Sequence, residues 1–515
     1  MSWDNMFGAV KEQLPKFNNY LLKDFRKKEI DRCIEFMHTV YQEAVKLFGG
    51  TLQYVGYRIL SPERRISYSV ENVLIKGRVN IQSSELQLVE YMFKFNDKLF
   101  PVYIYLPYLH NGAIVINDTR YYLQLPIIER TIYRVTDGVI IKVMRSPLQF
   151  WRTEQYSYVS TSNRSFFDAV ITTKVHYKKG KSNTARSTRT PLLLYLLSQY
   201  EFMHLQKDIF SISPEDVQFT EENNPDDETY LYFKCRDGIY LRVHNDNIMS
   251  DIVYRRYVAS LLYIISGVKR YSIADLYNRT FYRTLLGKNL YGQATKESLA
   301  AGHAESDLNS LRTYLDQYTK QELKLLHIYC DDIFDLFVVV FFNIDNWLLE
   351  YTPNDLFAKR IGDINLVLMQ MVKATFTRFY DTLRKNKNIQ DKNIHSMLKM
   401  DPMAISSIYK IPSLQSNSSL YNDNILLSTL IKKIRLLSTQ ENRSKKKTNL
   451  ITAKEHQFHP SFLAIESALA ISSSSPGVSG DINPFAQIDS MGYFRKEDMP
   501  WYDEILPLSK YLVSV

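Results

Sequence analysis

Apolar positions near the start of the chain recur every three or four residues, which predicts a helix over residues 8–49. Gly49-Gly50 is the expected end of that helix, because glycine is favoured just past a helix C-terminus. The recurring apolar positions are Leu21, Leu22, Phe25, Ile30, Cys33, Ile34, Phe36 and Met37.

The pattern changes over residues 51–150 to short runs rich in Val, Ile and Tyr, which predicts strands separated by turns. Asn117-Asp118 and Asp137-Gly138 lie between such runs, as hairpin turns do. The predicted strands are Leu52–Ile59, Val70–Ile75, Val102–Leu106, Ala113–Ile116, Tyr121–Leu125 and Val139–Met144.

Helices are predicted again in the second half of the chain. Pro191 opens an apolar helix, since proline suits a first helical turn. Residues 305–386 carry helical stripes and include one long amphipathic helix, Ile364–Leu383. Residues 387–424 are polar and irregular, and Leu426–Leu437 is predicted to be helical. The whole pattern is that of a mixed α+β chain.

Composition excludes several classes of protein. The chain has 515 residues, 45% of them hydrophobic, so it is too apolar to be disordered and long enough for two or three domains. Cys33, Cys235 and Cys330 are far apart, which argues against a disulfide framework or a cysteine-based zinc site. The start of the chain lacks the apolar core of a secretion signal, and the longest apolar run, Leu336–Phe342, is too short to cross a bilayer. A soluble, intracellular protein is expected.

Strong catalytic motifs are absent from the sequence, which has no G-x-x-x-x-G-K-[ST], no H-E-x-x-H and no G-x-S-x-G. Two groups contain metal-ligand residue types. The first group, Glu455, His456 and His459, is interpreted as a polar loop before a proline. The second group, Asp331, Asp332 and Asp335, is interpreted as carboxylates that cap or solvate a helix rather than bind Mg²⁺.

Two basic segments are candidates for contact with a polyanion. The net charge of +9 is modest, so clustering matters more than the total. Residues 432–447 hold seven cations and one acid, which would neutralise several phosphates or else form an exposed loop without a ligand. Residues 177–189 are interpreted as a solvated loop. The cations are Lys432, Lys433, Arg435, Arg443, Lys445, Lys446 and Lys447 in the first, and Lys178, Lys179, Lys181, Arg186 and Arg189 in the second.

Five segments, in this order, resemble the N-terminal half of the β subunit of multisubunit DNA-dependent RNA polymerases. Leu106-Pro107 followed by residues 112–120 resembles the strand–turn–strand G-x-F-I-I-N-G-x-E-R, with Asp118 in place of the turn glycine. Residues 190–197 resemble the helix K-I-P-V-x-x-L-L-R-A-L-G.

The other three segments lie in the second half. Residues 355–361, with Arg378 in the helix that follows, resemble D-x-x-x-N-[KR]-R-[IV]. Residues 424–434 resemble N-x-x-S-x-L-x-H-x-R-R without its histidine. The fifth is similar to H-P-[ST]-x-x-G, P-N-I-G-L-I-N-S-L and A-x-x-N-x-x-G-F in succession, but lacks the intervening E-T-P-E-G; it comprises His459-Pro460-Ser461, Pro476 to Asn483, Ala486-Gln487, and Gly492-Tyr493-Phe494.

The resemblance implies an α+β multidomain fold with the protrusion, lobe and fork of RNA polymerase β subunits, built from mixed helices and antiparallel strands. Residues 1–150 would be an N-terminal helix and a protrusion-like region, and residues 151–345 a lobe-like region. Residues 346–457 would return to the protrusion and fork helices, and residues 458–515 would form a fork loop region and an intersubunit tail.

The place at which the chain stops resembles the split β subunits of giant, phiKZ-like bacteriophages. The family's metal-binding run N-A-D-F-D-G-D lies in β′ and is absent here, so the resemblance implies no catalytic residue and no metal or other cofactor in this chain, with Mg²⁺ on a β′-like subunit. The implied partners are a C-terminal β-like fragment, β′-like fragments, template DNA and nascent RNA. A further phage-specific promoter-recognition subunit is left open, and no membrane contact is expected.

The resemblance also gives the two predicted sites a role. The basic cluster at residues 432–447 would lie near the fork and face template or hybrid, and the apolar tail would contact the next β fragment. The chain would then be a subunit of a nucleotidyltransferase that transcribes phage genes, inactive alone, in the infected host or packaged in the virion. Two alternatives are a phage DNA-binding or promoter-recognition factor attached to a polymerase, and a structural virion protein. The tail residues are Trp501, Tyr502, Ile505, Leu506, Leu508, Tyr511 and Leu512.

Overall fold

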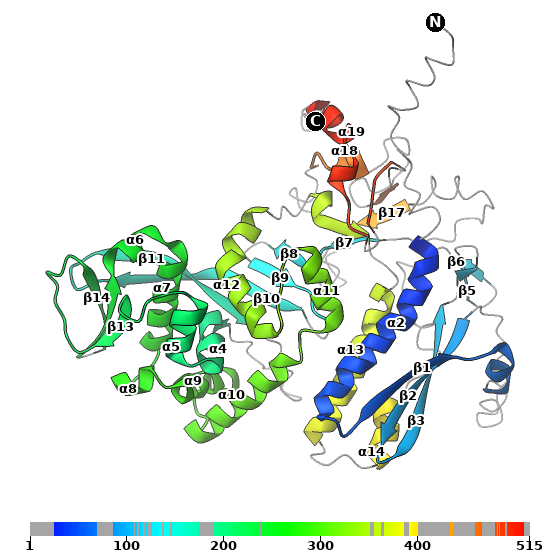
Figure 1. The fold of residues 1–515 in the computed structure, drawn as a ribbon, viewed down its shortest axis with the longest axis horizontal. Helices are drawn as coiled ribbons and strands as arrows, with labels where there is room; N and C mark the ends of the chain where they lie inside the picture. Colours follow the sequence, from blue (N-terminus) through cyan, green and yellow to red (C-terminus); the bar gives the residue numbers. More distant parts are fainter. Residues whose placement is uncertain are drawn as a thin grey trace, which may run out of the picture. The chain divides into compact units, whose positions relative to one another are not determined.

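The computed structural model of the chain divides into two compact units, each described by itself (Figure 1). Unit 1 consists of Met1–Arg130 and Thr352–Val515, and unit 2 of Thr131–Tyr351, so unit 2 is an insertion in the sequence of unit 1. The structure describes residues 25–68, 86–107, 109–110, 113–116, 119–121, 126–135, 138–144, 147–174, 189–236, 238–350, 355–361, 365–385, 391–399, 433–436, 459–465, 479–481, 483, 485–489 and 492–508.

The first sheet of unit 1 is antiparallel, in the order β1-β2-β3. Its β2–β3 hairpin turns at Asn96 and Asp97, whose φ angles of 45° and 60° are those of a two-residue type I′ turn. Asn and Asp adopt these angles at less cost than other side chains, so the local sequence sets the register of the hairpin. The strands are β1 Gln53–Ile59, β2 Leu86–Phe95 and β3 Lys98–Pro107.

Helices α2, Phe25–Val45, and α13, Asn365–Lys385, lie side by side against this sheet, although they are far apart in sequence (Figure 1). Aromatic side chains fill the space between these helices and the sheet. The ring of Tyr41 lies 5.0 Å from that of Phe93, and the ring of Phe379 lies 5.4 Å from that of Phe48. These contacts join the first and last thirds of the chain in one hydrophobic core.

The remaining described elements of unit 1 are short. A helical turn covers residues 62–68, and a second small antiparallel sheet has the order β4-β5-β6. A four-stranded sheet carries part of the predicted basic segment and is treated with it below. The other elements are η2 Lys46–Phe48, β4 Leu109–His110, β5 Ala113–Ile116, β6 Thr119–Tyr121, η4 Leu356–Ala358, α14 Asp391–Leu398, α18 Phe462–Ile465, η6 Lys496–Asp498, α19 Trp501–Ile505 and η7 Leu506–Leu508.

Unit 2 contains a five-stranded antiparallel sheet in the order β12-β11-β10-β9-β8. Residues alternate between buried and exposed along the first half of β11, and the buried face packs on helix α7. There Asp168 accepts hydrogen bonds from Tyr158 Oη at 2.8 Å and from Arg255 Nε at 2.7 Å. The elements are β8 Ile132–Val135, β9 Gly138–Ile141, β10 Leu148–Val159, β11 Ser165–Lys174, β12 Thr190–Pro191, α7 Ile252–Ser266 and α12 Ile333–Glu350.

A second, three-stranded antiparallel sheet of unit 2 has the order β13-β15-β14. Helices α9 and α10 form an antiparallel hairpin beside α4 (Figure 1). Gly287 allows α9 to approach the backbone of Ala300 in α10, because a Cβ at Gly287 would lie 2.0 Å from the Ala300 carbonyl oxygen. The elements are α4 Leu192–Gln199, α5 Phe202–His204, the π-helical turn η3 Leu205–Ile209, β13 Val217–Thr220, β14 Tyr230–Arg236, β15 Ile239–His244, α6 Asn245–Ser250, α8 Ile273–Leu276, α9 Arg279–Tyr291, α10 Glu297–Arg312 and α11 Gln317–Leu325.

The mixed α+β prediction is confirmed, as are the helices expected over residues 305–386. The helix predicted to open at Pro191 is present as α4, but it begins at Leu192, and Pro191 is the extended residue of β12 that precedes it rather than part of the first turn. Residues 387–424 are not uniformly irregular, since they contain α14, whose apolar Ile394 and Met397 are buried. The predicted strand Val70–Ile75 lies outside the described residues. The four predicted regions are finer than the two units and stay predictions.

The aspartates at the start of α12 confirm the helix-capping interpretation. Asp332 Oδ1 accepts hydrogen bonds from the backbone N–H groups of Phe334 and Asp335, at 2.7 and 3.1 Å. Asp335 Oδ2 accepts from the N–H groups of Asp331 and Asp332 in return. These carboxylates satisfy donors that a helix start leaves unpaired.

Candidate nucleic-acid interface

The predicted basic segment enters the described structure at β17, an inner strand of a four-stranded sheet in unit 1 with the order β16-β7-β17-β18. β17 runs parallel to β7 and antiparallel to β18. Lys433 lies opposite Asp481, and Arg435 opposite Ser479. The sheet therefore joins strands from four distant places in the sequence. They are β7 Pro126–Glu129, β16 Lys359–Ile361, β17 Lys433–Leu436 and β18 Ser479–Asp481.

The helix predicted over Leu426–Leu437 is wrong where the structure describes it, because Lys433–Leu436 is a strand. Those four residues alternate charged and apolar, a two-residue period typical of a strand. Pairing with β7 and β18 supplies the backbone hydrogen bonds that a helix would otherwise make internally. Of the seven predicted cations, the structure describes the backbone of Lys433 and Arg435. The others, Lys432, Arg443, Lys445, Lys446 and Lys447, lie outside the described residues.

One hydrophobic cluster supports this sheet. It contains Ile127 of β7 and Ile361 of β16, together with buried residues from the segment that follows His459. Because these side chains come from three separate parts of the chain, the cluster holds together β7, which pairs with β17, and β16, which pairs with β7. The buried members are Ile127, Leu356, Ile361, Ala464, Ile465, Ala486, Ile488, Phe494, Met499 and Tyr502.

His459, Ser461 and Asp355 contact one another beside this cluster, but their geometry does not form a catalytic triad. His459 Nδ1 lies 2.9 Å from Ser461 Oγ and 3.3 Å from Asp355 Oδ1, so a single ring nitrogen makes both contacts. A triad base uses one nitrogen for the nucleophile and the other for the carboxylate. Ser461 is fully buried, and its Oγ accepts a hydrogen bond from the N–H of Leu356 at 2.8 Å. The three residues tie the 459–461 turn to the start of η4.

Gly492-Tyr493-Phe494 adds an edge contact to the same sheet. Gly492 has a φ of +81°, and a Cβ there would lie 2.6 Å from the Ile361 carbonyl oxygen. The N–H of Ile361 donates to the Gly492 carbonyl at 2.8 Å, and Tyr493 forms a β-bridge with Arg360. Glycine is therefore required at residue 492 both for its conformation and for the close approach of the two backbones.

Cations gather around the ring of Tyr493. The guanidinium carbons of Arg130 and Arg360 lie 5.3 and 5.6 Å from its centroid. Arg130 also donates a hydrogen bond to the Phe357 carbonyl. Lys359, which precedes Arg360 in β16, forms an ion pair with Glu129. Tyr493 and Arg360 are buried and Arg130 is half-buried, so these contacts stabilise the sheet.

Among the residues that the structure describes, no group of three or more His, Cys, Asp or Glu side chains is placed to hold a metal ion. Glu455 and His456 lie outside those residues, and His459 makes the contacts given above. Among the helices that the structure describes, none is both long enough and apolar enough to span a bilayer.

Comparison with known proteins identifies the chain at the level of a family. The sequence profile of a family described as non-virion RNA polymerase subunit matches residues 5–506, nearly the whole chain. The chain belongs to this family. No curated protein matches it significantly. The family match agrees with the resemblance to RNA polymerases noted in the sequence, at the coarser level of a polymerase subunit.

In this polymerase subunit, part of the apolar tail that is predicted to contact a partner packs against the chain's own hydrophobic cluster. Tyr502 is 3% exposed, and its ring lies 5.1 Å from that of Phe357 in the supporting cluster. Burial raises the pKa of the Tyr502 phenol, and the neighbouring Asp355 and Asp503 raise it further. Trp501, Ile505 and Leu506 are half-buried against the same cluster. The side chain of Leu508 and the whole of Tyr511 and Leu512 lie outside the described residues, and partner contact by the tail stays a prediction.

The second basic segment of the subunit is described only at its end. Lys178, Lys179, Lys181 and Arg186 lie outside the described residues, whereas Arg189 is exposed and its guanidinium carbon lies 4.7 Å from the ring centroid of Trp151. Its position next to β12 places it at the edge of a cavity that sequence reasoning did not find. The arginine pair around Tyr493 was missed as well, because its members are far apart in sequence.

Proposed function

We propose that the chain is the N-terminal β fragment of a phage DNA-directed RNA polymerase. It forms one side of the cleft for template DNA and nascent RNA, and so supports transcription of phage genes. The observation that carries the proposal is the four-stranded sheet. Its strands β16, β17 and β18 come from the third, fourth and fifth segments that resemble polymerase β subunits, and these meet in one structure.

The insertion of unit 2 into unit 1 supports the same proposal. The chain leaves unit 1 after Arg130 and returns at Thr352. A protrusion that is interrupted by a lobe and then resumes has this connectivity, and the resemblance led us to expect it. The family match to an RNA polymerase subunit is independent of that topology.

In the proposed role the chain binds and shapes nucleic acid but does not supply the metal ligands. Mg²⁺, two-metal phosphoryl transfer and its carboxylates belong to a β′-like subunit. The partners are a C-terminal β-like fragment and β′-like fragments, with a promoter-recognition subunit as a further candidate. The family description as non-virion favours a polymerase made in the infected bacterium over one packaged in the particle.

Phosphate binding by the basic cluster is tested by replacing Lys432, Lys433 and Arg435 with Gln in the assembled polymerase. Glutamine keeps a long polar side chain at each position and removes the charge. Stability of the elongation complex across a salt series should fall, and the slope of log affinity against log salt should flatten by about one for each phosphate that the variant no longer neutralises.

The matched control replaces Lys178, Lys179 and Lys181 with Gln, which removes as many charges from the segment interpreted as a solvated loop. The control should change the slope much less. Equal slopes for wild type and the cluster variant, with the polymerase still assembled, would rule out the proposed placement of the cluster.

A further inference from the structure

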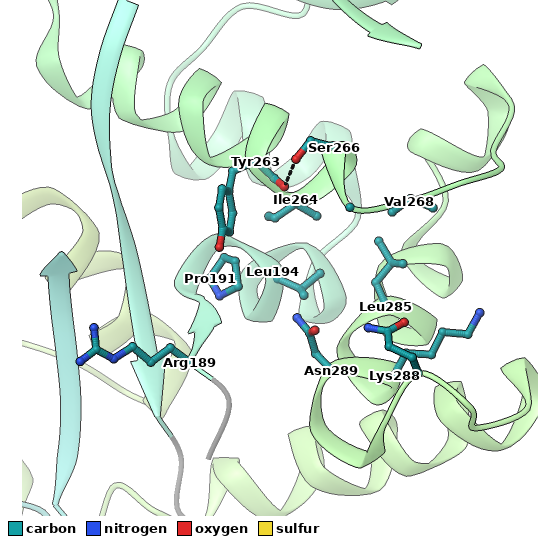
Figure 2. Close-up of a pocket in the computed structure, with 12 residues that line it drawn as sticks. Arg189, Pro191, Leu194, Tyr263, Ile264, Ser266, Val268, Leu285, Lys288 and Asn289 are labelled. Atoms are coloured by element: carbon teal, nitrogen blue, oxygen red, sulfur yellow. Dashed lines mark hydrogen bonds between the residues drawn. The ribbon is translucent and has the colours of Figure 1, made fainter. Parts of the chain in front are cut away.

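Unit 2 contains a cavity of about 320 Å³ between the β12–α4 junction, the C-terminal end of α7 and the second half of α9 (Figure 2). Volumes of this size are at the small end of those that bind small molecules or parts of larger ones. The described lining residues are Arg189, Pro191, Leu194, Tyr263, Ile264, Ser266, Gly267, Val268, Leu285, Lys288, Asn289 and Gln293.

The inside of the cavity combines apolar and polar side chains. Figure 2 shows Pro191, Leu194 and Leu285 around it, with the Tyr263 ring along one side and the Asn289 amide directed inward from α9. Ser266 Oγ donates to the Tyr263 carbonyl at 2.8 Å and so closes the end of α7. The lining thus combines an aromatic ring, apolar groups and an amide side chain.

The edge of the cavity is basic, and none of its described lining residues is acidic. Arg189 lies on one side over Trp151, and Lys288 on the other side pairs with Glu297 at 2.7 Å. The loop that contributes Val268 continues into Lys269 and Arg270, both exposed. Positive charge at the edge complements a ligand that carries negative charge outside an uncharged, ring-shaped part.

We propose that this cavity takes one unstacked base of a single-stranded nucleic acid, with the flanking phosphates held by the cations at its edge. Proteins that bind single strands combine base stacking on aromatic or apolar side chains with basic residues along the backbone. The amide of Asn289 provides hydrogen bonds to a base edge. The inference rests on the proposed function for the presence of nucleic acid and adds a site away from the basic cluster of residues 432–447.

The test measures the affinity of the full chain for a short fluorescein-labelled single-stranded DNA that contains 4-thiothymidine. Leu285→Trp fills the cavity, and Leu325→Trp is the matched control, since Leu325 is half exposed on α11 and outside the lining. Loss of one stacked base should weaken binding of the Leu285→Trp variant about tenfold and leave the control unchanged. Irradiation should cross-link wild type within residues 263–293, and the filled variant much less.

Asn289→Ala serves as a second variant in case Leu285→Trp does not fold, and should weaken binding by a smaller factor, about threefold. Unchanged affinity and cross-linking in a folded variant overturns the site, as does the absence of single-strand binding by the full chain. If Leu285→Trp prevents polymerase assembly but not single-strand binding, the cavity holds a polypeptide and the proposal is wrong. The salt series on the basic cluster reports the proposed function separately, so either idea can fail alone.

Discussion

At the residue scale, Gly287 gives the most sharply defined stability prediction. An added methyl group would lie 2.0 Å from the carbonyl oxygen and 2.8 Å from the Cα of Ala300, so α9 and α10 would have to separate. We expect Gly287→Ala to lower the free energy of unfolding by about 1–3 kcal/mol, as overpacking of a close contact does. Urea unfolding followed by circular dichroism measures the change.

Gly302→Ala is the matched control, because nothing lies within 4 Å of a Cβ at that position of α10. It should leave stability unchanged or raise it by up to about 1 kcal/mol, since alanine favours a helix over glycine. If both variants behaved alike, the close approach of α9 and α10 would be incorrect.

Asp307 predicts a pH dependence. It is 6% exposed in the α9–α10 hairpin, and burial raises the pKa of its carboxyl to about 6 against the lowering effects of the Tyr291 hydroxyl and His303. The folded state therefore binds this proton more tightly than the unfolded state does. The contribution of Asp307 to the free energy of unfolding is therefore complete below about pH 4, the pKa of this carboxyl in the unfolded chain. It is lost as the pH rises through about 6, the pKa in the folded chain.

Asp307→Asn keeps an acceptor for Tyr291 and removes the titration. The variant should gain stability relative to wild type between pH 4 and 7, by up to about 3 kcal/mol. Urea midpoints measured at several pH values check this expectation. Parallel profiles for the two proteins would mean that Asp307 titrates normally.

At the element scale, α12 depends on its N-terminal cap. Asp332→Ala removes the acceptor for two backbone N–H groups and should cost about 1 kcal/mol. Asp331→Ala is the control, because Asp331 joins the cap through its backbone N–H. Thermal unfolding of the two variants gives the comparison, and an equal loss in both would contradict the capping account.

Elements whose stabilising contacts are local could be predicted from the sequence. Asp332 and Asp335 precede an apolar run, and Pro191 precedes another, so the starts of α12 and α4 followed from neighbouring residues. β17 could not be predicted in this way, because its partners β7 and β18 come from distant segments and pairing outweighs local preference.

Nucleic-acid contact by the candidate site stays a prediction. Charge density and resemblance singled out Lys433 and Arg435, which lie in the sheet. The contact of Arg130 and Arg360 with Tyr493 joins residues separated by hundreds of positions, which no local pattern indicates.

At the scale of the whole molecule, unit 1 is discontinuous in sequence and contains four of the five polymerase-like segments, whereas the inserted unit 2 contains the second segment and the cavity. Tyr502 is part of the core of unit 1, so removal of the C-terminal tail would disturb folding as well as any partner contact. The half-buried Ile505 and Leu506 are better positions at which to examine contact with another subunit.

RNA extension on a preassembled template–RNA scaffold tests the central claim most directly, because such a scaffold needs no promoter. The polymerase is prepared with and without this chain, and the missing chain is then added back. A β fragment that forms the cleft is required for elongation, so we predict extension only when the chain is present, and none from the chain alone. Equal extension with and without the chain would contradict the account and would favour a promoter-recognition factor.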